Sequence, residues 1–365
     1  MLRILQGVAA GVPELEMEIN MTKMWQEIME QPEVLKRTVE TNKSVIDKLI
    51  GELETRDIST VIIAARGTSD HAAVYAKYAI ETLVGIPVSL AAPSVLTMYN
   101  KKIDMKNCFV IGISQSGKAA DAIEVVRSAA EQGALTMSVT NFVDSPLAEI
   151  SKYHLFCDTG LETSVAATKT FTSTVYLLIN FIAKWAKNEE LQKELKQTPE
   201  IMNSVFGQAD TIKETVQKYR FMKECFVLAR GINYSIALEA ALKIQETTYV
   251  RAKAFATSDF HHGPFAMVER DMPVIVYAPE GPSSKDILEM IHKLKDSQAD
   301  ILIVSNNKSL LEMGDSGIEI PAGISDYVSP LINVVVAQMF ACNLSLLKGL
   351  NPDSPRGLNK VTITR

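Results

Sequence analysis

The chain has 365 residues, of which 47% are hydrophobic and 22% are charged, and its formal net charge is −6. This composition is that of a globular protein, and the length predicts two domains, because one core rarely serves more than about 250–300 residues. The negative charge argues against a general nucleic-acid binder. The four cysteines are scattered, which supports neither a zinc site nor a disulfide framework, so we expect buried reduced thiols and a cytoplasmic location.

No segment is recognised as a membrane span. The most apolar long segment, residues 175–186, is interrupted by Asn180 and Lys184 and is too short, because a spanning helix takes about 20 apolar residues. The N-terminus has no adequate signal core. We therefore expect no membrane partner.

Residues 1–57 read as mostly helical, with a short amphipathic segment at 22–32 and a second helix to about residue 53. Beyond them, apolar runs typical of strands buried on both faces alternate with helical segments. This alternation predicts a doubly wound, mainly parallel sheet flanked by helices. Strands are expected at 60–64, 108–113, 135–140 and 154–157, with helices starting at about 68 and 118 and a long helix at 162–187.

The pattern then repeats. Residues 61–67 (VIIAARG) match residues 225–231 (CFVLARG), which predicts an internal duplication with two α/β domains of similar plan. Residues 187–199 read as a linker or a surface helix, and the tail as either frayed or pinned into a groove. Later strands are expected at 273–278, 301–305 and 317–321 and a final helix at 329–349, which gives a helical segment at 1–57, domains at 58–195 and 196–350, and a tail at 351–365.

A Ser-Gln-Ser-Gly turn, residues 114–117, lies between a buried strand and the expected start of a helix. Two hydroxyls, backbone N–H groups and the positive end of a helix dipole suit a phosphate, although a simple N-cap is the alternative. The turn is neither a Walker loop nor a dinucleotide fingerprint. The corresponding turn of the second half, residues 279–282 (Pro-Glu-Gly-Pro), is unsuited to phosphate, so we expect one site per chain.

Glu239, Lys243 and Glu246 share one stripe of a helix expected at 235–249. Most such stripes are a solvated face with an ion pair. The alternative is that Glu246 works as an acid–base pair with His262, which lies in a loop closed by Gly263 and Pro264.

Taken together, these stretches resemble the sugar-isomerase (SIS) domain family, and more closely the isomerase half of glucosamine-6-phosphate synthase. The resemblance implies two tandem SIS domains, a sugar phosphate as the small-molecule ligand, a homodimer, and neither a metal nor an organic cofactor. The matching stretches are residues 66–69, 114–117, 141–145, 165–172, 229–234, 238–246, 262–264 and 355–360.

The resemblance also implies roles for individual residues. Glu246 would move a proton between C1 and C2 of the sugar, His262 of a neighbouring subunit would assist ring opening, and Lys360 would form an imine with the open-chain sugar. Two hydroxyls of the family pattern are replaced, by Ala119 and Ala167. The side chains expected to hold phosphate or sugar are Ser69, Ser114, Gln115, Ser116, Val165, Lys243 and Asn359.

The resemblance leads us to expect an amino-sugar phosphate deaminase that converts glucosamine 6-phosphate and water to fructose 6-phosphate and ammonia. No cysteine precedes Cys108, so we expect no glutaminase domain to supply ammonia. Two alternatives stay open: a deglycase for fructosamine 6-phosphates of the fructoselysine 6-phosphate type, and a non-catalytic sugar-phosphate sensor. The presence of Glu246, His262 and Lys360 together favours an enzyme.

Overall fold

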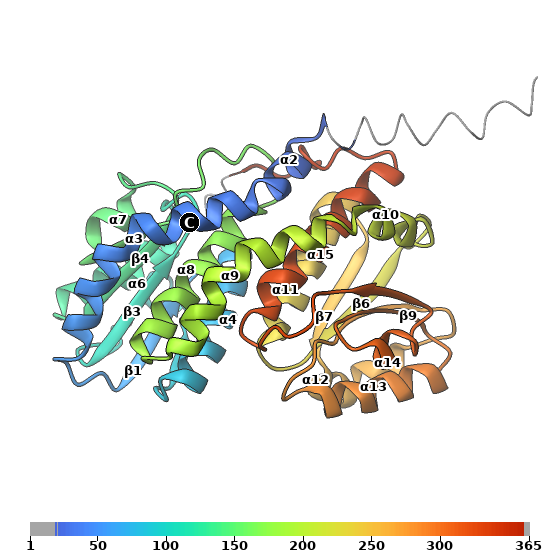
Figure 1. Cartoon of the computed structure of the whole chain (residues 1–365). Helices are drawn as coiled ribbons and strands as arrows, with labels where there is room; N and C mark the ends of the chain where they lie inside the picture. The colour runs from blue at the N-terminus through green and yellow to red at the C-terminus, as the bar shows by residue number, and fades with distance from the viewer. Residues whose placement is uncertain (1–18, 20, 361–365) are drawn as a thin grey trace, which may run out of the picture.

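Two five-stranded sheets, each built only from parallel strands, form the two halves of the molecule (Figure 1). The computed structural model describes residue 19 and residues 21–360. The first sheet has the order β2-β1-β3-β4-β5. Its strands are β1 (Thr60–Ala64), β2 (Val88–Leu90), β3 (Cys108–Ile113), β4 (Leu135–Thr140) and β5 (Tyr153–Phe156).

The second sheet repeats this plan. Read from the opposite edge, its order is β7-β6-β8-β9-β10, which is the order of the first sheet strand for strand. The predicted doubly wound, tandem α/β architecture is therefore confirmed. The strands are β6 (Glu224–Ala229), β7 (Arg251–Ala256), β8 (Pro273–Tyr277), β9 (Asp300–Ser305) and β10 (Ser316–Glu319).

Sheet and helices pack closely because small residues lie where they meet. All six residues of β3 are buried, and a Cβ added at Gly112 would lie 2.8 Å from a methyl of Val126 and 2.9 Å from one of Leu147. Those two side chains belong to α6 (Ala120–Glu131) and α7 (Pro146–Ile150). A larger residue at this position would overpack the core.

The N-terminal helix α3 (Gln31–Leu53) runs along the first half and packs against α8 (Lys169–Trp185) and α9 (Glu189–Phe206). The short helix α2 (Lys23–Met29), which precedes it, packs against α15 (Ser329–Leu347) of the second half. Of the two interpretations of residues 187–199, a linker or a surface helix, the helix is correct: α9 begins at Glu189, and its N-cap Asn188 accepts a hydrogen bond of 3.0 Å from the backbone of Leu191. Residues 1–18 and 20, part of the segment expected to be helical, lie outside the described residues.

The two halves meet through α11 (Tyr234–Thr248), which packs against α4 (Thr68–Leu83) of the first half and α15 (Ser329–Leu347) of the second. Among the described residues, α15 is the one helix long and apolar enough to cross a membrane. The sequence-based expectation that no segment is long and apolar enough to span a membrane was wrong for this helix. Because 89% of its apolar window is buried inside the protein, α15 has the setting of a core helix.

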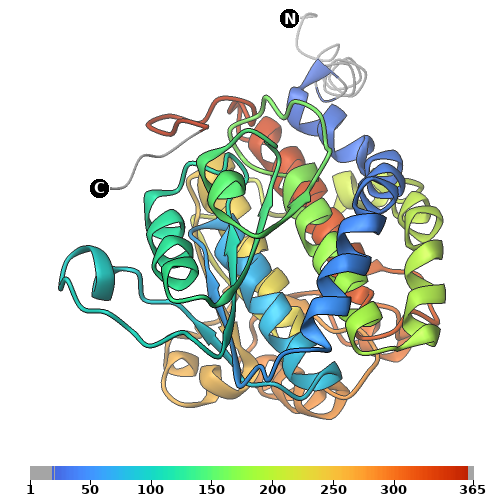
Figure 2. The same ribbon diagram turned by 90° about the vertical axis from the view of Figure 1, so that its left-hand side faces the viewer.

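The long helix expected at 162–187 begins only at Lys169. The carboxylate of Glu162 accepts backbone N–H groups of Thr168 and Thr170, at 2.9 and 3.1 Å, so residues 162–168 fold back as a loop over the helix N-terminus. Figure 2 shows another loop, between β2 and β3, that extends away from the body. The remaining helices are α5 (Ser94–Thr97), α10 (Ala209–Gln217), η1 (Gly231–Asn233), α12 (Thr257–His261), η2 (Pro264–Met267), α13 (Ser284–Asp296) and α14 (Lys308–Leu311).

Candidate functional site

A cavity of 360 Å³ lies beyond the carboxyl ends of β1 and β3 and brings together both halves and the tail. In parallel α/β sheets ligands bind at this edge. Eight of the ten residues singled out in the sequence line it, whereas Lys243 and His262 do not. The lining residues are Arg66, Gly67, Thr68, Ser69, Ser114, Gln115, Ser116, Ala119, Val165, Ala167, Glu246, Leu358, Asn359 and Lys360.

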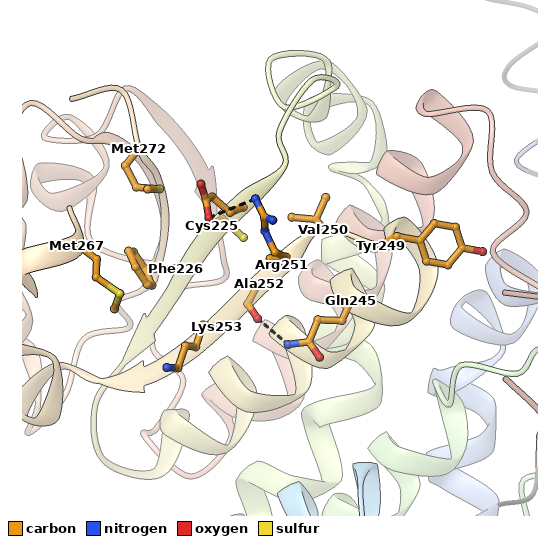
Figure 3. A pocket seen from close by; sticks show the side chains of 11 residues that line it. Cys225, Phe226, Gln245, Tyr249, Val250, Arg251, Ala252, Lys253, Met267 and Met272 are labelled. Atoms are coloured by element: carbon orange, nitrogen blue, oxygen red, sulfur yellow. Dashed lines mark hydrogen bonds and ion pairs between the residues drawn. The ribbon is translucent and has the colours of Figure 1, made fainter. Parts of the chain in front are cut away.

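A larger cavity, of 570 Å³, lies beside the edge strand β7 (Figure 3). Its polar groups are already engaged: Arg251 pairs with Glu224 at 3.7 Å, and Gln245 donates to the carbonyl of Ala252 at 2.5 Å. Burial raises the pKa of the Cys225 thiol to about 12, so it is no nucleophile at neutral pH. The smaller cavity is therefore the candidate site.

The Ser-Gln-Ser-Gly turn has the geometry of an anion site. Gly117 has a φ of +64°, and a Cβ there would lie 2.1 Å from the hydroxyl of Ser145, so only glycine fits. The N-cap of α6 is Ala119, which has no side chain to cap the helix. The first N–H groups of α6 are thus left for a ligand, which disagrees with the reading of the turn as a simple N-cap.

A second helix N-terminus points at the same cavity. The N-cap of α4 is Gly67, at φ +56° and without a side-chain cap, and Thr68 and Ser69 follow it. At the rim, Arg66 places its guanidinium against Asp121, with two contacts of 2.9 Å. Two uncapped helix termini and several hydroxyls therefore converge where a phosphate would gain most from them.

The equivalent turn of the second half carries negative charge instead. The carboxylate of Glu280 accepts from Asn307 at 3.0 Å, and Asp326 lies so close to Gly281 that a Cβ there would be 3.2 Å from its carboxylate. Burial raises the pKa of Asp326. Two carboxyl groups at one turn repel an anion, so the halves differ in ligand chemistry although they share a fold.

The charged stripe of α11, formed by Glu239, Lys243 and Glu246, lies largely in the interior. Its interpretation as a solvated helix face was wrong. The side chains of Glu239 and Lys243 are 0% exposed and that of Glu246 is 22% exposed. The ammonium of Lys243 lies 2.6 Å from Glu246 and 3.3 Å from Glu239. Burial alone would lower the pKa of Lys243, but the two carboxylates outweigh it and raise the pKa well above its usual value. Lys243 therefore stays charged beneath Glu246.

Lys360 is fixed at the wall of the cavity. Its ammonium donates to the carboxylate of Glu162 at 2.5 Å and to the carbonyl of Ser164 at 2.8 Å. Burial would raise the pKa of Glu162, but the nearby ammonium and the hydroxyl and backbone donors of Thr170 and Thr168 hold it below its usual value. The ion pair thus ties the tail to the loop at residues 162–168.

The tail, left open as frayed or pinned, is pinned as far as Lys360; residues 361–365 lie outside the described part of the chain. Asp353 accepts the backbone N–H groups of Lys23 and Met24, at 2.9 and 2.8 Å, at the start of α2. Its own carbonyl accepts the N–H of Val165 at 3.1 Å. Buried Glu27 of α2 binds Thr163 and Ser164 of the same loop. The N-terminal helix, the loop and the tail therefore frame the cavity together.

His262 is exposed in the turn after α12 and does not line the cavity of its own chain. The sequence did not predict three residues around the site, namely His71, Glu162 and Asp353. Glu162 and Asp353 gave no signal because each binds backbone groups that no motif marks. Among the described residues, no group of three or more His, Cys, Asp or Glu side chains could hold a metal ion.

The sequence pattern of the SIS domain matches residues 55–183 and 219–348. The chain belongs to the SIS domain family. It is 33% identical over 344 residues to the glutamine–fructose-6-phosphate aminotransferase (isomerizing) of Aquifex aeolicus, across 93% of this chain and 57% of the relative. The chain thus spans somewhat more than half the length of that curated relative.

Solved structures of SIS proteins share the fold. The C-terminal domain of glucosamine-fructose-6-phosphate aminotransferase from Francisella tularensis superposes with a TM-score of 0.82 at 24% identity, over 92% of this chain and 98% of that one. Glucosamine-6-phosphate deaminase from Thermotoga maritima superposes with a TM-score of 0.75 at 20% identity, over 94% and 100% of the two chains. At these identities the likeness concerns the fold alone.

Proposed function

We propose that this SIS protein isomerises an amino-sugar phosphate and releases its amine, converting glucosamine 6-phosphate and water to fructose 6-phosphate and ammonia. One observation carries the proposal: a single cavity holds the phosphate-type turn at Ser114–Ser116, the carboxylate of Glu246 and the ammonium of Lys360. The relatives named for isomerising chemistry on fructose 6-phosphate support the same substrate class.

The phosphate would bind at the N-termini of α4 and α6, where uncapped backbone N–H groups and the hydroxyls of Ser69, Ser114 and Ser116 are available. These groups recognise the charge and geometry of a phosphate without reacting with it. The rest of the open-chain sugar would extend through the cavity towards Glu246.

Glu246 is the proposed base. Its carboxylate would take the proton from C2 of the open-chain aldehyde, which leaves an enolamine, and return it to C1, which gives the imine of fructose 6-phosphate. Water would then add to C2 and ammonia would leave. Lys243, at 2.6 Å, donates to this carboxylate and holds it in place.

Lys360 is the second proposed catalytic group. Its neutral amine would add to C2 of the imine in place of water and displace ammonia, and water would then release fructose 6-phosphate and the free lysine; in this structure Lys360 donates to Glu162. Glu162, at 2.5 Å, is the acceptor within reach of the proton that Lys360 would have to lose. His262, which is exposed here, would assist ring opening in the cavity of a second subunit of a homodimer.

We place this activity in the cytoplasm, since the four cysteines are free and buried, as suits a reducing compartment.

One observation favours a second candidate, a fructosamine-6-phosphate deglycase. Ala119 and Ala167 both line the cavity, where the family pattern has hydroxyl side chains, so there is more room for a substituent on the amine. The same base would serve in the opposite sense: it would take a proton from C1 and return it to C2, and water would cleave the resulting imine at C1 to give glucose 6-phosphate and the free amine.

The test is to incubate the protein with glucosamine 6-phosphate and measure ammonia and fructose 6-phosphate together. We expect equal amounts of both, lost in Glu246→Gln and retained in Glu124→Gln, whose exposed carboxylate pairs with Arg127 on the surface. Turnover of fructoselysine 6-phosphate alone would establish the deglycase. Tight sugar-phosphate binding without turnover of either substrate would overturn the catalytic role of Glu246 and identify a sensor.

A further inference from the structure

A buried chain of polar side chains joins the two SIS domains beneath the cavity. His71 of α4 contacts Glu239 of α11, with 2.7 Å between its Nδ1 and the Oε2 atom. The His71 side chain is 16% exposed and that of Glu239 is 0% exposed. A carboxylate buried this completely needs its partners, because no water replaces them.

Thr68, also on α4, completes the contacts. Its hydroxyl donates to Oε1 of Glu239 at 3.2 Å and lies 3.3 Å from the ammonium of Lys243, from which it accepts. Lys243 has three N–H donors, and the structure offers them three acceptors: Thr68, Glu239 and Glu246. The ammonium is thus shared, and its closest contact, 2.6 Å, is to Glu246.

The sharing depends on how much negative charge Glu239 presents to Lys243. A carboxylate has no proton to give, so His71 must donate from Nδ1, which fixes the tautomer of a neutral ring. This hydrogen bond is made to Oε2, whereas Lys243 and Thr68 both contact Oε1. Without the hydrogen bond from His71, the buried carboxylate of Glu239 would lack a donor. The ammonium of Lys243, which lies between two carboxylates, would then move towards Glu239.

We propose that His71 is a positioning residue of the proton-transfer step: from the first domain it holds Glu239, so that Lys243 stays on Glu246 in the second. The inference rests on the function proposed above for Glu246. His71 does not line the cavity, so it acts through Glu239 and Lys243 and touches no substrate. The proton-moving carboxylate is therefore competent only while α4 and α11 are docked together.

The test compares two variants of similar size. Asn keeps an N–H donor near the position of Nδ1, whereas Leu removes it. In His71→Leu we expect kcat for the sugar phosphate to fall roughly 10- to 100-fold, as is typical when a supporting partner is lost, with KM almost unchanged. His71→Asn should retain most of the wild-type kcat. Tyr75→Phe is the matched control, because Tyr75 also lies on α4 and donates across the domains, to the carbonyl of Tyr327 at 2.7 Å.

A kcat of His71→Leu equal to wild type would overturn the proposal, as would an equal loss in His71→Asn or in Tyr75→Phe. Crystal structures of the two His71 variants supply a readout that needs no turnover. We expect Lys243 to move from Glu246 towards Glu239 in the Leu variant and to stay in the Asn variant. If wild-type protein fails to turn over the substrate, the proposed function fails, and these structures still decide whether His71 positions Lys243.

Discussion

Lys243 is a cation from which water is excluded, and it compensates two carboxylates at once. Replacing it by methionine would leave Glu239 and Glu246 facing each other without the ammonium that now lies between them. We expect Lys243→Met to lower the free energy of unfolding by about 3–5 kcal/mol, the usual cost of an unpaired buried charge, and to remove turnover. Urea unfolding and the ammonia assay measure the two effects.

The matched control for Lys243→Met is Arg127→Met. Arg127 pairs with Glu124 at 2.9 Å, but their side chains are 48% and 41% exposed, so we expect a loss of about 1 kcal/mol or less. Adding Glu239→Gln to Lys243→Met should recover part of the stability, because it removes one of the two carboxylate charges that have lost the ammonium. Equal free energies of unfolding for the Lys243 and Arg127 variants would show that the buried ion pairs of Lys243 contribute little to stability.

Glu162 makes the fold sensitive to acid. Its folded-state pKa lies below the ordinary 4.5 because Lys360 and local donors outweigh burial. Its contribution to stability is thus complete above about pH 4.5 and is lost as the pH falls through the lower, folded-state pKa, since the unfolded state takes up the proton first.

We expect Glu162→Gln to lower the free energy of unfolding by about 1–3 kcal/mol at neutral pH, because charge-assisted hydrogen bonds are lost. The difference from wild type should shrink as the pH falls below 4.5, the usual value for this group. Urea unfolding across that range checks the prediction. A difference that stays constant with pH would mean that Glu162 does not titrate in this way.

At the scale of elements, the turn before α6 depends on a glycine. A Cβ at Gly117 would meet Ser145 at 2.1 Å, and the residue has a left-handed φ. We expect Gly117→Ala to destabilise the protein by about 2–4 kcal/mol through backbone strain and overpacking. It should also raise KM for the sugar phosphate about tenfold, the effect of losing a hydrogen bond to a charged group. Thermal unfolding and steady-state kinetics measure these changes.

Gly133 provides the comparison for Gly117. It has a similar φ of +79°, but no atom lies within 4 Å of its added Cβ. Gly133→Ala should therefore cost only the conformational strain, about 1–2 kcal/mol, and leave KM unchanged. If both variants changed KM alike, the turn at Gly117 would not be the phosphate site.

The elements most visible in the sequence were those buried on both faces. Strands β1, β3 and β4 lie where the sequence predicted them: β1 and β3 are nearly continuous apolar runs, and β4 alternates apolar residues with Thr and Ser. The strand β7 was not predicted because alanines alternate with Arg251, Lys253 and Phe255 in this edge strand, which gives no apolar run. The start of α8 was misplaced because Glu162 bonds the backbone of a loop that the local sequence allows to be helical.

Only those residues of the candidate site that belong to a local sequence motif could be predicted from the sequence. The turn at Ser114–Ser116 follows a strand and precedes a helix, which is a local pattern. The contact of His71 with Glu239 joins residues 168 positions apart, and no local pattern predicts a pair that tertiary packing brings together. The burial of Lys243 likewise follows from the docking of α4 on α11.

At the scale of the whole molecule, the exposed position of His262 makes the proposed homodimer testable by complementation. His262→Ala and Glu246→Gln should each be inactive alone. Co-expressed with different tags, they should form hybrid dimers in which one site has both residues and the other has neither. Random pairing then predicts about a quarter of wild-type activity. No recovery in purified hybrid dimers would place His262 outside the partner's site.

The two sheets have the same topology but contribute different functional groups to the cavity. The first supplies the phosphate-type turn, whereas the corresponding turn of the second has Glu280 and Asp326. The second supplies Glu246 on α11, which docks against the first. Neither half holds all the groups of the cavity, so separating them would leave neither with the proposed activity.

The tail follows both sheets in the sequence, and this order has a consequence for folding during translation. All five strands of the first sheet lie between residues 60 and 156 and pair only with one another, so this sheet can form while later residues are still being synthesised. Glu246 comes later, and Lys360 reaches its place against Glu162 only after both sheets have left the ribosome. Under the proposed function, the turns that would hold the phosphate therefore form in the nascent chain before the groups that would act on the sugar.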